Sequence, residues 1–253
     1  MPDIFESSKQ KFAWAEKRFG DLQREIENFG QLHPYKEVTE PHPDKVGYEV
    51  RKIILTKPLP LDIAHITAEV VGSLRGTLDN AGYSIAVASG KINPKSTAFP
   101  FAGSAEGMAK AIKGRCGDIP PQFHSLFCGF QPYPGGNDFL WALNEVCNTE
   151  KHKIVIPMGN GAYPMGAYAR GPRFFSIPTP HVWDSAKNEM VLITLGPGTD
   201  FNYQFNFLFF VAFGEVKFVE RKEVIKVLHR MGGIVQSLLV AMEAEARRTK
   251  LIS

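Results

Sequence analysis

The chain has 253 residues, of which 44% are hydrophobic and 22% are charged. This balance excludes disordered and fibrous proteins, and the length is sufficient for one large domain with a sizeable core. The formal net charge of +3 is too small to indicate by itself a partner such as nucleic acid or an anionic membrane.

The cysteines and the N-terminal segment indicate the cell compartment. Cys116, Cys128 and Cys147 are widely spaced and form no C-x-x-C pair, which is typical of reduced thiols rather than of a disulfide framework. The N-terminal segment is charged and lacks the apolar core of a signal peptide. The longest strongly apolar stretch, near 205–213, is far shorter than the roughly 20 residues of a membrane-spanning helix. We therefore expect a cytoplasmic protein that does not bind a membrane.

Apolar periodicity predicts two long helices in the first part of the chain, at 4–30 and 61–88. In the second helix an apolar side chain recurs every three or four residues. Three glycines lower the helix propensity of this segment, and they would either let another backbone pack closely or shorten the helix: Gly72, Gly76 and Gly82. Between the two helices, 33–45 contains three prolines and is expected to be a loop. The alternation at 48–56 predicts a strand.

Shorter elements follow. Helices are expected at 105–113, 120–129 and 138–150, and a turn before the third ends in Asn137 and Asp138, either of which would cap its N terminus. From residue 153 the pattern changes and predicts four strands, at 153–157, 173–178, 190–195 and 202–219. The Gly-rich segment 159–171 predicts a hairpin-like excursion, and an amphipathic helix is expected at 221–247.

Helices that flank a mainly antiparallel β region are typical of the α+β class. We therefore expect a helical bundle portion packed with a mainly antiparallel β-sheet, followed by a long C-terminal helix. No repeat or linker-like segment interrupts the chain, so residues 1–253 are expected to form a single domain. The alternative is a mainly helical subdomain at 1–152 and a β-rich subdomain with the C-terminal helix at 153–253.

Polar residues gather on the helix predicted at 61–88. Arg75 and Asp79 are four residues apart and share one face of this helix, and Asn80 follows immediately. One interpretation is an ordinary surface ion pair, which contributes on the order of a few tenths of a kcal/mol. The other is an arginine that Asp79 holds, so that its guanidinium binds a carboxylate or phosphate through two hydrogen bonds.

A second polar group ends the helix predicted at 138–150 and consists of Asn144, Asn148, Glu150, Lys151 and His152. In the purely structural interpretation, the cations complement the negative end of the helix dipole. In the functional interpretation, His152 is a general acid or base that Asn148 or a carboxylate orients.

Common catalytic and metal-binding motifs are absent from the sequence. Neither G-x-G-x-x-G nor G-x-x-x-x-G-K-[ST] occurs, which excludes the usual phosphate-binding loops. No G-x-S-x-G is present for a hydrolase serine. The histidines form no H-x-x-x-H or H-E-x-x-H, so we expect no metal and no cofactor.

The two polar groups resemble those of a widespread group of uncharacterised bacterial proteins. These proteins carry an R-[SG]-x-L-D-[HN] helix, a later Q-P-Y turn and an L-x-x-L-x-N-x-[DE]-K-H helix end. The corresponding segments here run from Arg75 to Asn80, from Gln131 to Tyr133 and from Leu140 to His152. The resemblance covers 46–156 and implies no particular activity.

The helix pair also resembles the HEPN superfamily, whose helical bundles often dimerise and whose nuclease members cut RNA through an R-x(4–6)-H motif. That resemblance implies an arginine that steadies the phosphate and a histidine that moves protons at the 2′-hydroxyl. The chain has no intact R-x(4–6)-H, because Asn80 stands where Arg75 would need its histidine and Cys147 stands where His152 would need its arginine. The pair would form only if Arg75 and His152 met from separate helices.

We therefore expect a homodimeric or otherwise homo-oligomeric binding or scaffold protein with a helix-borne polar network. A HEPN-like ribonuclease or RNA-binding protein in defence or stress response is one alternative, and an enzyme on a small anionic ligand is another. In the enzymes, Arg75 and His152 would be catalytic. The binding residues would be Asp79, Asn80, Asn148, Glu150 and Lys151.

Overall fold

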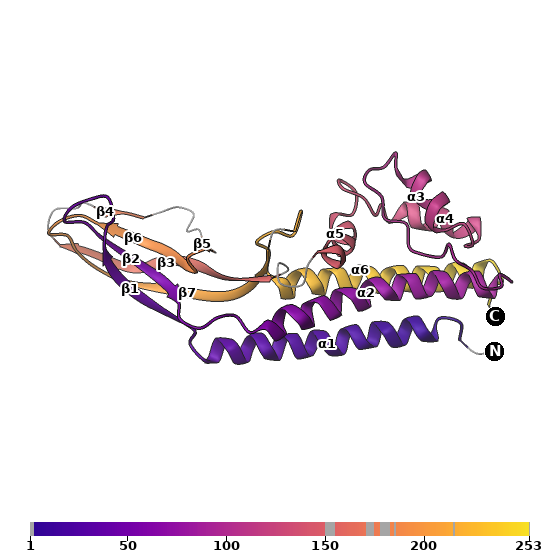
Figure 1. Cartoon of the computed structure of the whole chain (residues 1–253), viewed down its shortest axis with the longest axis horizontal. Coiled ribbons are helices and arrows are strands. Elements are labelled where there is room, and N and C mark those ends of the chain that lie inside the picture. The colour runs from indigo at the N-terminus through magenta and orange to yellow at the C-terminus, as the bar shows by residue number, and fades with distance from the viewer. Residues whose placement is uncertain are drawn as a thin grey trace. The chain divides into compact units, whose positions relative to one another are not determined.

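A computed structural model describes residues 3–149, 155–170, 175–177, 183–184, 186–214 and 216–252, with the side chains of 155–170 and 202–209 left out. This part of the chain has an α+β fold with an antiparallel sheet and a long C-terminal helix, as the sequence predicted (Figure 1). The chain forms two compact units. The helical unit consists of Met1–Gln23, Asp62–Ile154 and Phe213–Ser253, and the sheet unit consists of Arg24–Leu61 and Val155–Ala212.

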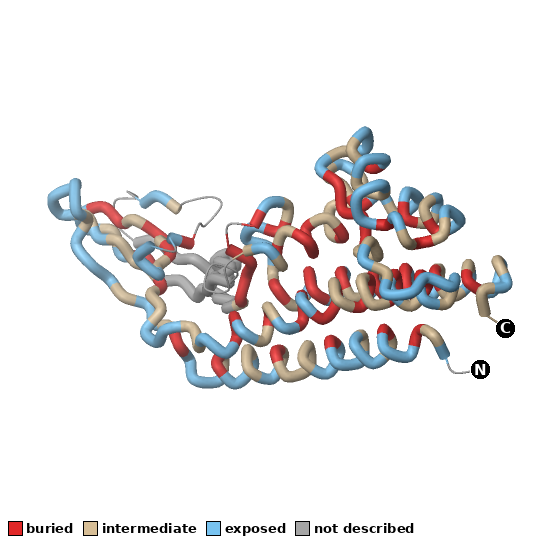
Figure 2. The backbone as a smooth tube through the Cα atoms, turned by 45° about the vertical axis from the view of Figure 1, so that its right-hand side comes forward, coloured by how far each residue is buried: buried red, intermediate tan, exposed pale blue. Residues whose placement is uncertain are grey.

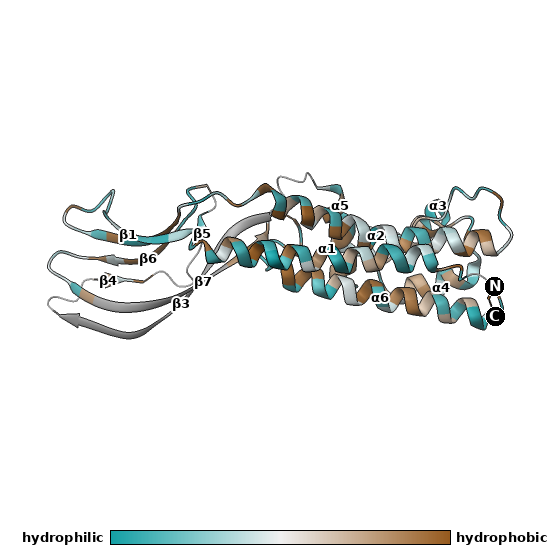
Figure 3. Cartoon of the chain, turned by 90° about the horizontal axis from the view of Figure 1, so that it is seen from below, coloured by the Kyte–Doolittle hydropathy of each residue, from teal (hydrophilic) through white to brown (hydrophobic). Residues whose placement is uncertain are grey.

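Three long helices form the body of the helical unit: α1 (Glu6–Gln31), which continues beyond this unit, α2 (Leu61–Ala88) and α6 (Val224–Arg248). The buried residues of α2 and α6 recur every three or four residues, and those of α1 recur every seven, so each helix buries one face (Figure 2). Figure 3 shows the same amphipathic pattern as alternating hydrophilic and hydrophobic segments along each helix. The sequence prediction of these three helices is confirmed.

Three shorter helices complete this unit: α3 (Met108–Arg115), α4 (Pro121–Gly129) and α5 (Asp138–Asn148). Both α4 and α5 pack against α6. The predicted cap of α5 is confirmed, because the Oδ1 of Asn137 accepts a hydrogen bond from the Leu140 amide at 3.1 Å. This cap marks the start of α5.

One helix in the described ranges, α6, is long and apolar enough to cross a membrane by length and composition alone. The core helix of a soluble protein has the same composition, and 39% of the most apolar stretch of α6 is buried inside the protein. Met231, Val235 and Leu238 are among its fully buried side chains. The structure is therefore compatible with a soluble protein.

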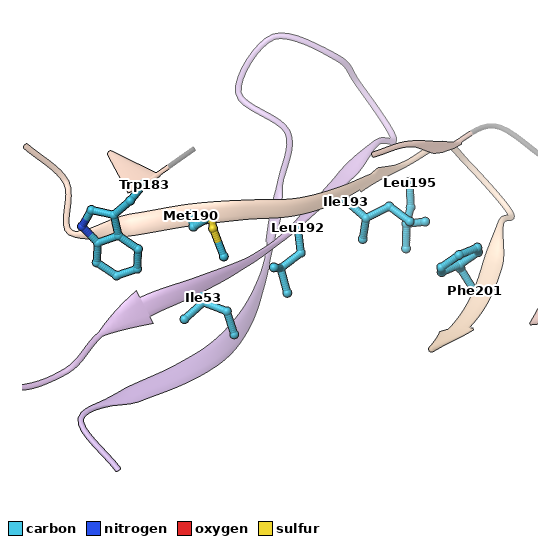
Figure 4. Close-up of a cluster of buried hydrophobic side chains, with 7 residues drawn as sticks. All are labelled: Ile53, Trp183, Met190, Leu192, Ile193, Leu195 and Phe201. Carbon is cyan, nitrogen blue, oxygen red and sulfur yellow. The ribbon is translucent and has the colours of Figure 1, made fainter. Parts of the chain in front are cut away.

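The sheet unit contains an antiparallel sheet in the order β1 (Tyr35–Pro41), β2 (Glu49–Leu55), β6 (Glu189–Leu195) and β4 (Phe175–Ser176), with β5 (Trp183–Asp184) also paired to β6. A second, two-stranded sheet pairs β3 (Val155–Arg170) with β7 (Asp200–Phe213). A cluster of buried apolar side chains packs on the first sheet (Figure 4): Ile53, Trp183, Met190, Leu192, Ile193, Leu195 and Phe201.

Two sequence predictions in the sheet unit are wrong. The loop predicted at 33–45 contains β1, which pairs along its whole length with β2. An edge strand tolerates the proline at position 41, because one side of its backbone has no partner strand among the described residues. The excursion predicted at 159–171 is strand β3 as far as Arg170, since its backbone pairs with β7 despite the glycines. The strand predicted at 202–219 ends at Phe213.

Candidate anion-binding site

Helix α2 places Arg75 and Asp79 on one face, as the sequence predicted. The distance between Arg75 Nε and Asp79 Oδ2 is 3.9 Å, which is an ion pair but too long for a hydrogen bond. The two side chains are 27% and 35% exposed. Each of them therefore has hydrogen-bonding capacity that the other does not use.

Asp79 forms a hydrogen bond with the chain segment that follows α2. Its Oδ1 accepts a hydrogen bond from the backbone amide of Phe99 at 2.9 Å. The same segment is held by Cys116, whose thiol donates to the Ala98 carbonyl oxygen at 3.3 Å. Gly82 gives it room, because a Cβ at that position would clash with the Thr97 carbonyl oxygen. The Asp79 carboxylate thus fixes the segment Thr97–Phe99 against α2.

The ring of Phe101 connects this segment to Arg75. Phe99 is buried and packs edge-on against both Phe101 and Phe127, with ring centroids 5.0 Å and 5.2 Å apart. The guanidinium carbon of Arg75 lies 6.0 Å from the centroid of Phe101, within the range of a cation–π contact. The position of the guanidinium is therefore set by packing rather than by a hydrogen-bonded carboxylate.

The Arg75 side chain forms a hydrogen bond with the Cys147 side chain, but one of its donors is unused. Its Nε is buried and has no hydrogen-bond partner among the described residues. A buried polar atom without a partner is rare in native proteins and often marks the position of a bound ion or water. The remaining donors belong to a guanidinium whose side chain is partly exposed. A guanidinium binds a carboxylate or phosphate most strongly through two parallel N–H donors.

Helix α5 meets α2 at this position through Cys147. Burial raises the pKa of the Cys147 thiol, and the positive charge of the nearby Arg75 opposes part of that rise. A thiol with a raised pKa stays protonated at neutral pH and is a weak nucleophile. The fold thus brings the end of the second polar group beside the first, but it adds no activated cysteine.

The other predicted site residues lie elsewhere or outside the described residues. Asn80 faces α1, where its Nδ2 donates to Ser7 Oγ at 3.2 Å. Asn148 is exposed at the last position of α5. The three residues that follow in the predicted group lie outside the described residues, so the expected pairing of Arg75 with a histidine is not tested: Glu150, Lys151 and His152.

Asn144 is the second buried polar side chain of this region with an unused atom. Its Nδ2 donates to Glu145 Oε1 at 3.3 Å, while its Oδ1 is buried without a partner in the part of the chain that the structure describes. Asn144 is 8% exposed, so it faces the interior and not the solvent that Asn148 faces. Asn144 and Asn148 therefore belong to the same polar group in the sequence but differ in burial.

Phe99, Phe101 and Cys147 also contribute to the site, although no sequence motif predicts this role. No short-range pattern connects these residues with α2, because only the tertiary fold brings them to Arg75. Within the described ranges no group of three His, Cys, Asp or Glu side chains could hold a metal ion. The chain matches no protein-family model, and neither a curated protein nor a solved structure is detectably similar to it.

Proposed function

We propose that the protein binds a small anionic ligand, with the Arg75 guanidinium as the anchor, and that it does so without catalysis. The observation that carries this proposal is the buried Nε of Arg75, which has no hydrogen-bond partner among the described residues although the side chain is held against Phe101. A carboxylate or phosphate would satisfy these donors with two parallel hydrogen bonds.

The neighbours of Arg75 support binding rather than catalysis. The Asp79 carboxylate, the obvious candidate for a base, accepts a hydrogen bond from the Phe99 amide and anchors a chain segment. The Cys147 thiol, the obvious candidate for a nucleophile, has a pKa that burial raises. Asp79 therefore has a structural role and Cys147 is a weak nucleophile, in agreement with a polar network that holds a binding site in shape.

A thermal-shift panel of inorganic phosphate, sulfate and small dicarboxylates tests the proposal, since a ligand that binds the native state raises the Tm. Arg75→Gln is the test variant and Arg18→Gln is its matched control. Arg18 is 22% exposed but already pairs with Asp21 and Glu69. We expect a shift in the wild type and in Arg18→Gln and none in Arg75→Gln. A panel without any shift, or an equal shift in Arg75→Gln, would overturn the proposal.

The two enzyme functions that the sequence also allows make a different prediction. A HEPN-like ribonuclease and an enzyme on a small anionic ligand both require His152 together with Arg75. Cleavage of single-stranded RNA, or turnover of the bound anion, that is lost in His152→Ala would favour one of them and contradict the non-catalytic proposal.

The location in the cytoplasm and the assembly into a homo-oligomer are also predictions. The three free thiols of Cys116, Cys128 and Cys147 support a reducing compartment such as the cytoplasm. The expected homo-oligomer is tested by light scattering in solution. A molar mass equal to the 28.1 kDa of one chain would contradict it.

A further inference from the structure

A second surface of the helical unit combines cations with aromatic rings. It consists of Phe139 and Trp141 on α5, Lys217, Phe218 and Lys222 before α6, and Arg230 on α6, and we call it the basic–aromatic surface. Lys217 Nζ lies 5.4 Å from the Phe218 centroid and 5.9 Å from that of Trp141. Lys222 Nζ and the Arg230 guanidinium carbon lie 5.2 Å and 5.1 Å from the Phe139 centroid. Each cation is therefore within cation–π range of a ring.

The backbone before α6 holds this surface in shape. The amide of Phe213 donates to the Lys222 carbonyl oxygen and the amide of Arg221 donates to the Phe213 carbonyl oxygen, both at 2.9 Å. Phe218 has a φ of 69°, which is rare for an aromatic residue. Its ring packs edge-on against Trp141, with the centroids 5.3 Å apart. The rings are therefore presented by a closed loop and a helix rather than by a mobile tail.

The cations of this surface have no acidic partners among the described residues. Lys217, Lys222 and Arg230 are exposed and form no ion pair with any carboxylate that the structure describes. Two described acids close to these cations in sequence have other partners, because Glu223 pairs with Lys226 at 2.6 Å and Glu220 lies 3.9 Å from Arg221. The unpaired positive charge makes this surface attractive to a polyanion.

A groove continues the surface along α6. It has a volume of about 540 Å³, and Phe130, Asn137, Lys226, His229 and Arg230 are among the residues that line it. Arg230 belongs both to this groove and to the contact with Phe139, so the two are continuous. The groove is open at Gly233, because a Cβ there would have no atom within 4 Å.

We propose that the basic–aromatic surface and its groove bind a single-stranded nucleic acid, a function separate from the anion site at Arg75. Proteins that hold single strands combine a basic groove for the phosphates with aromatic rings for the bases. On binding, the flexible Lys217 and Lys222 side chains move from the rings to phosphates, and bases stack on the rings. An acidic peptide or a nucleic-acid duplex would contact the cations alone. Neither ligand would stack on the rings of Phe139, Trp141 and Phe218.

The test measures the fluorescence anisotropy of a labelled oligouridine of about 20 nucleotides with the full chain, over a series of salt concentrations. The test variant combines Lys217→Gln, Lys222→Gln and Arg230→Gln. The matched control combines Arg247→Gln, Arg248→Gln and Lys250→Gln, which removes the same charge from the other end of the α6 region. We expect the test variant to bind at least about tenfold more weakly and to lower the salt slope by about 2, whereas the control stays within about twofold of the wild type.

A second arm tests the rings without altering the protein. A strand with the same phosphates but abasic sugars should bind at least about tenfold more weakly than oligouridine, because it cannot stack. The proposal is overturned if the wild type binds no single strand, or if the control variant weakens binding as much as the test variant. It is also overturned if abasic strands, duplex RNA or polyglutamate bind as tightly, since the surface would then recognise charge alone. Binding that survives in Arg75→Gln separates this surface from the anion site.

Discussion

The carboxylate of Asp79 accepts a 2.9 Å hydrogen bond from the backbone amide of Phe99, a residue 20 positions further along the chain. This bond ties the segment after α2 back onto the helix. The same segment carries Phe101, against which the Arg75 guanidinium lies. The structure of the site therefore depends on Asp79, although Asp79 itself contacts Arg75 only at 3.9 Å.

Removal of the Asp79 carboxylate is expected to destabilise the protein. A hydrogen bond to a charged group contributes about 1.5–3 kcal/mol, so Asp79→Ala should lower the Tm by roughly 4–10 °C. Asp79→Asn keeps an oxygen acceptor for the Phe99 amide and should lose less than half of this. Differential scanning calorimetry of both variants measures the difference. Equal stability of Asp79→Ala and the wild type would show that the bond does not hold the segment.

Alanine substitutions at two glycines of α2 should change the free energy of unfolding in opposite directions. A Cβ at Gly82 would clash with the Thr97 carbonyl oxygen and lie 3.0 Å from Ile119 Cδ1, whereas a Cβ at Gly72 would have no atom within 4 Å. We expect Gly82→Ala to cost more than about 2 kcal/mol and Gly72→Ala to gain up to about 1 kcal/mol of helix propensity. Denaturant titration of the two variants is the measurement. A stabilising Gly82→Ala would contradict the close packing of Thr97 on α2.

The thiol of Cys116 should make stability depend on alkaline pH. Burial raises the pKa of this thiol from 9.0 to about 12. Below about pH 9 the thiol is protonated in both the folded and the unfolded state, so it adds no pH dependence. As the pH rises from about 9 towards 12, the thiol ionises first in the unfolded chain, and the free energy of unfolding falls.

Urea titrations at about pH 8 and pH 10 measure this effect. Cys116→Ala should lose less stability than the wild type between the two pH values, whatever its own starting stability. Cys128→Ala, which removes an exposed thiol, should follow the wild type. An unchanged pH dependence in Cys116→Ala would mean that this thiol ionises alike in both states.

The helices could be predicted from the sequence because their signals are local. The apolar stripe from Ile63 to Ile85 predicted α2 at the residues where it is found, and Asn137 marked the start of α5. Strand β1 could not be predicted in the same way, because the prolines at positions 34, 41 and 43 favour a loop and only the pairing with β2 makes 35–41 a strand. The glycine-rich β3 likewise depends on its partner β7.

The candidate site was predictable only in part. The spacing of Arg75 and Asp79 placed them on one face, because residues four apart are neighbours on a helix. Asn80 lies about 100° further round α2 and so faces Ser7 on α1. Phe101 and Cys147 reach Arg75 through tertiary packing of distant segments, for which the sequence contains no short-range signal.

The most direct test of anion binding at Arg75 is isothermal titration calorimetry. It measures the affinity of the wild type and of two Arg75 variants for one small anion. The anion is the compound of the panel with the largest thermal shift. Only the fork of a guanidinium gives two parallel hydrogen bonds, so we predict a loss of about tenfold or more in Arg75→Lys as well as in Arg75→Gln. Full affinity in Arg75→Gln would contradict the claim that Arg75 anchors the ligand.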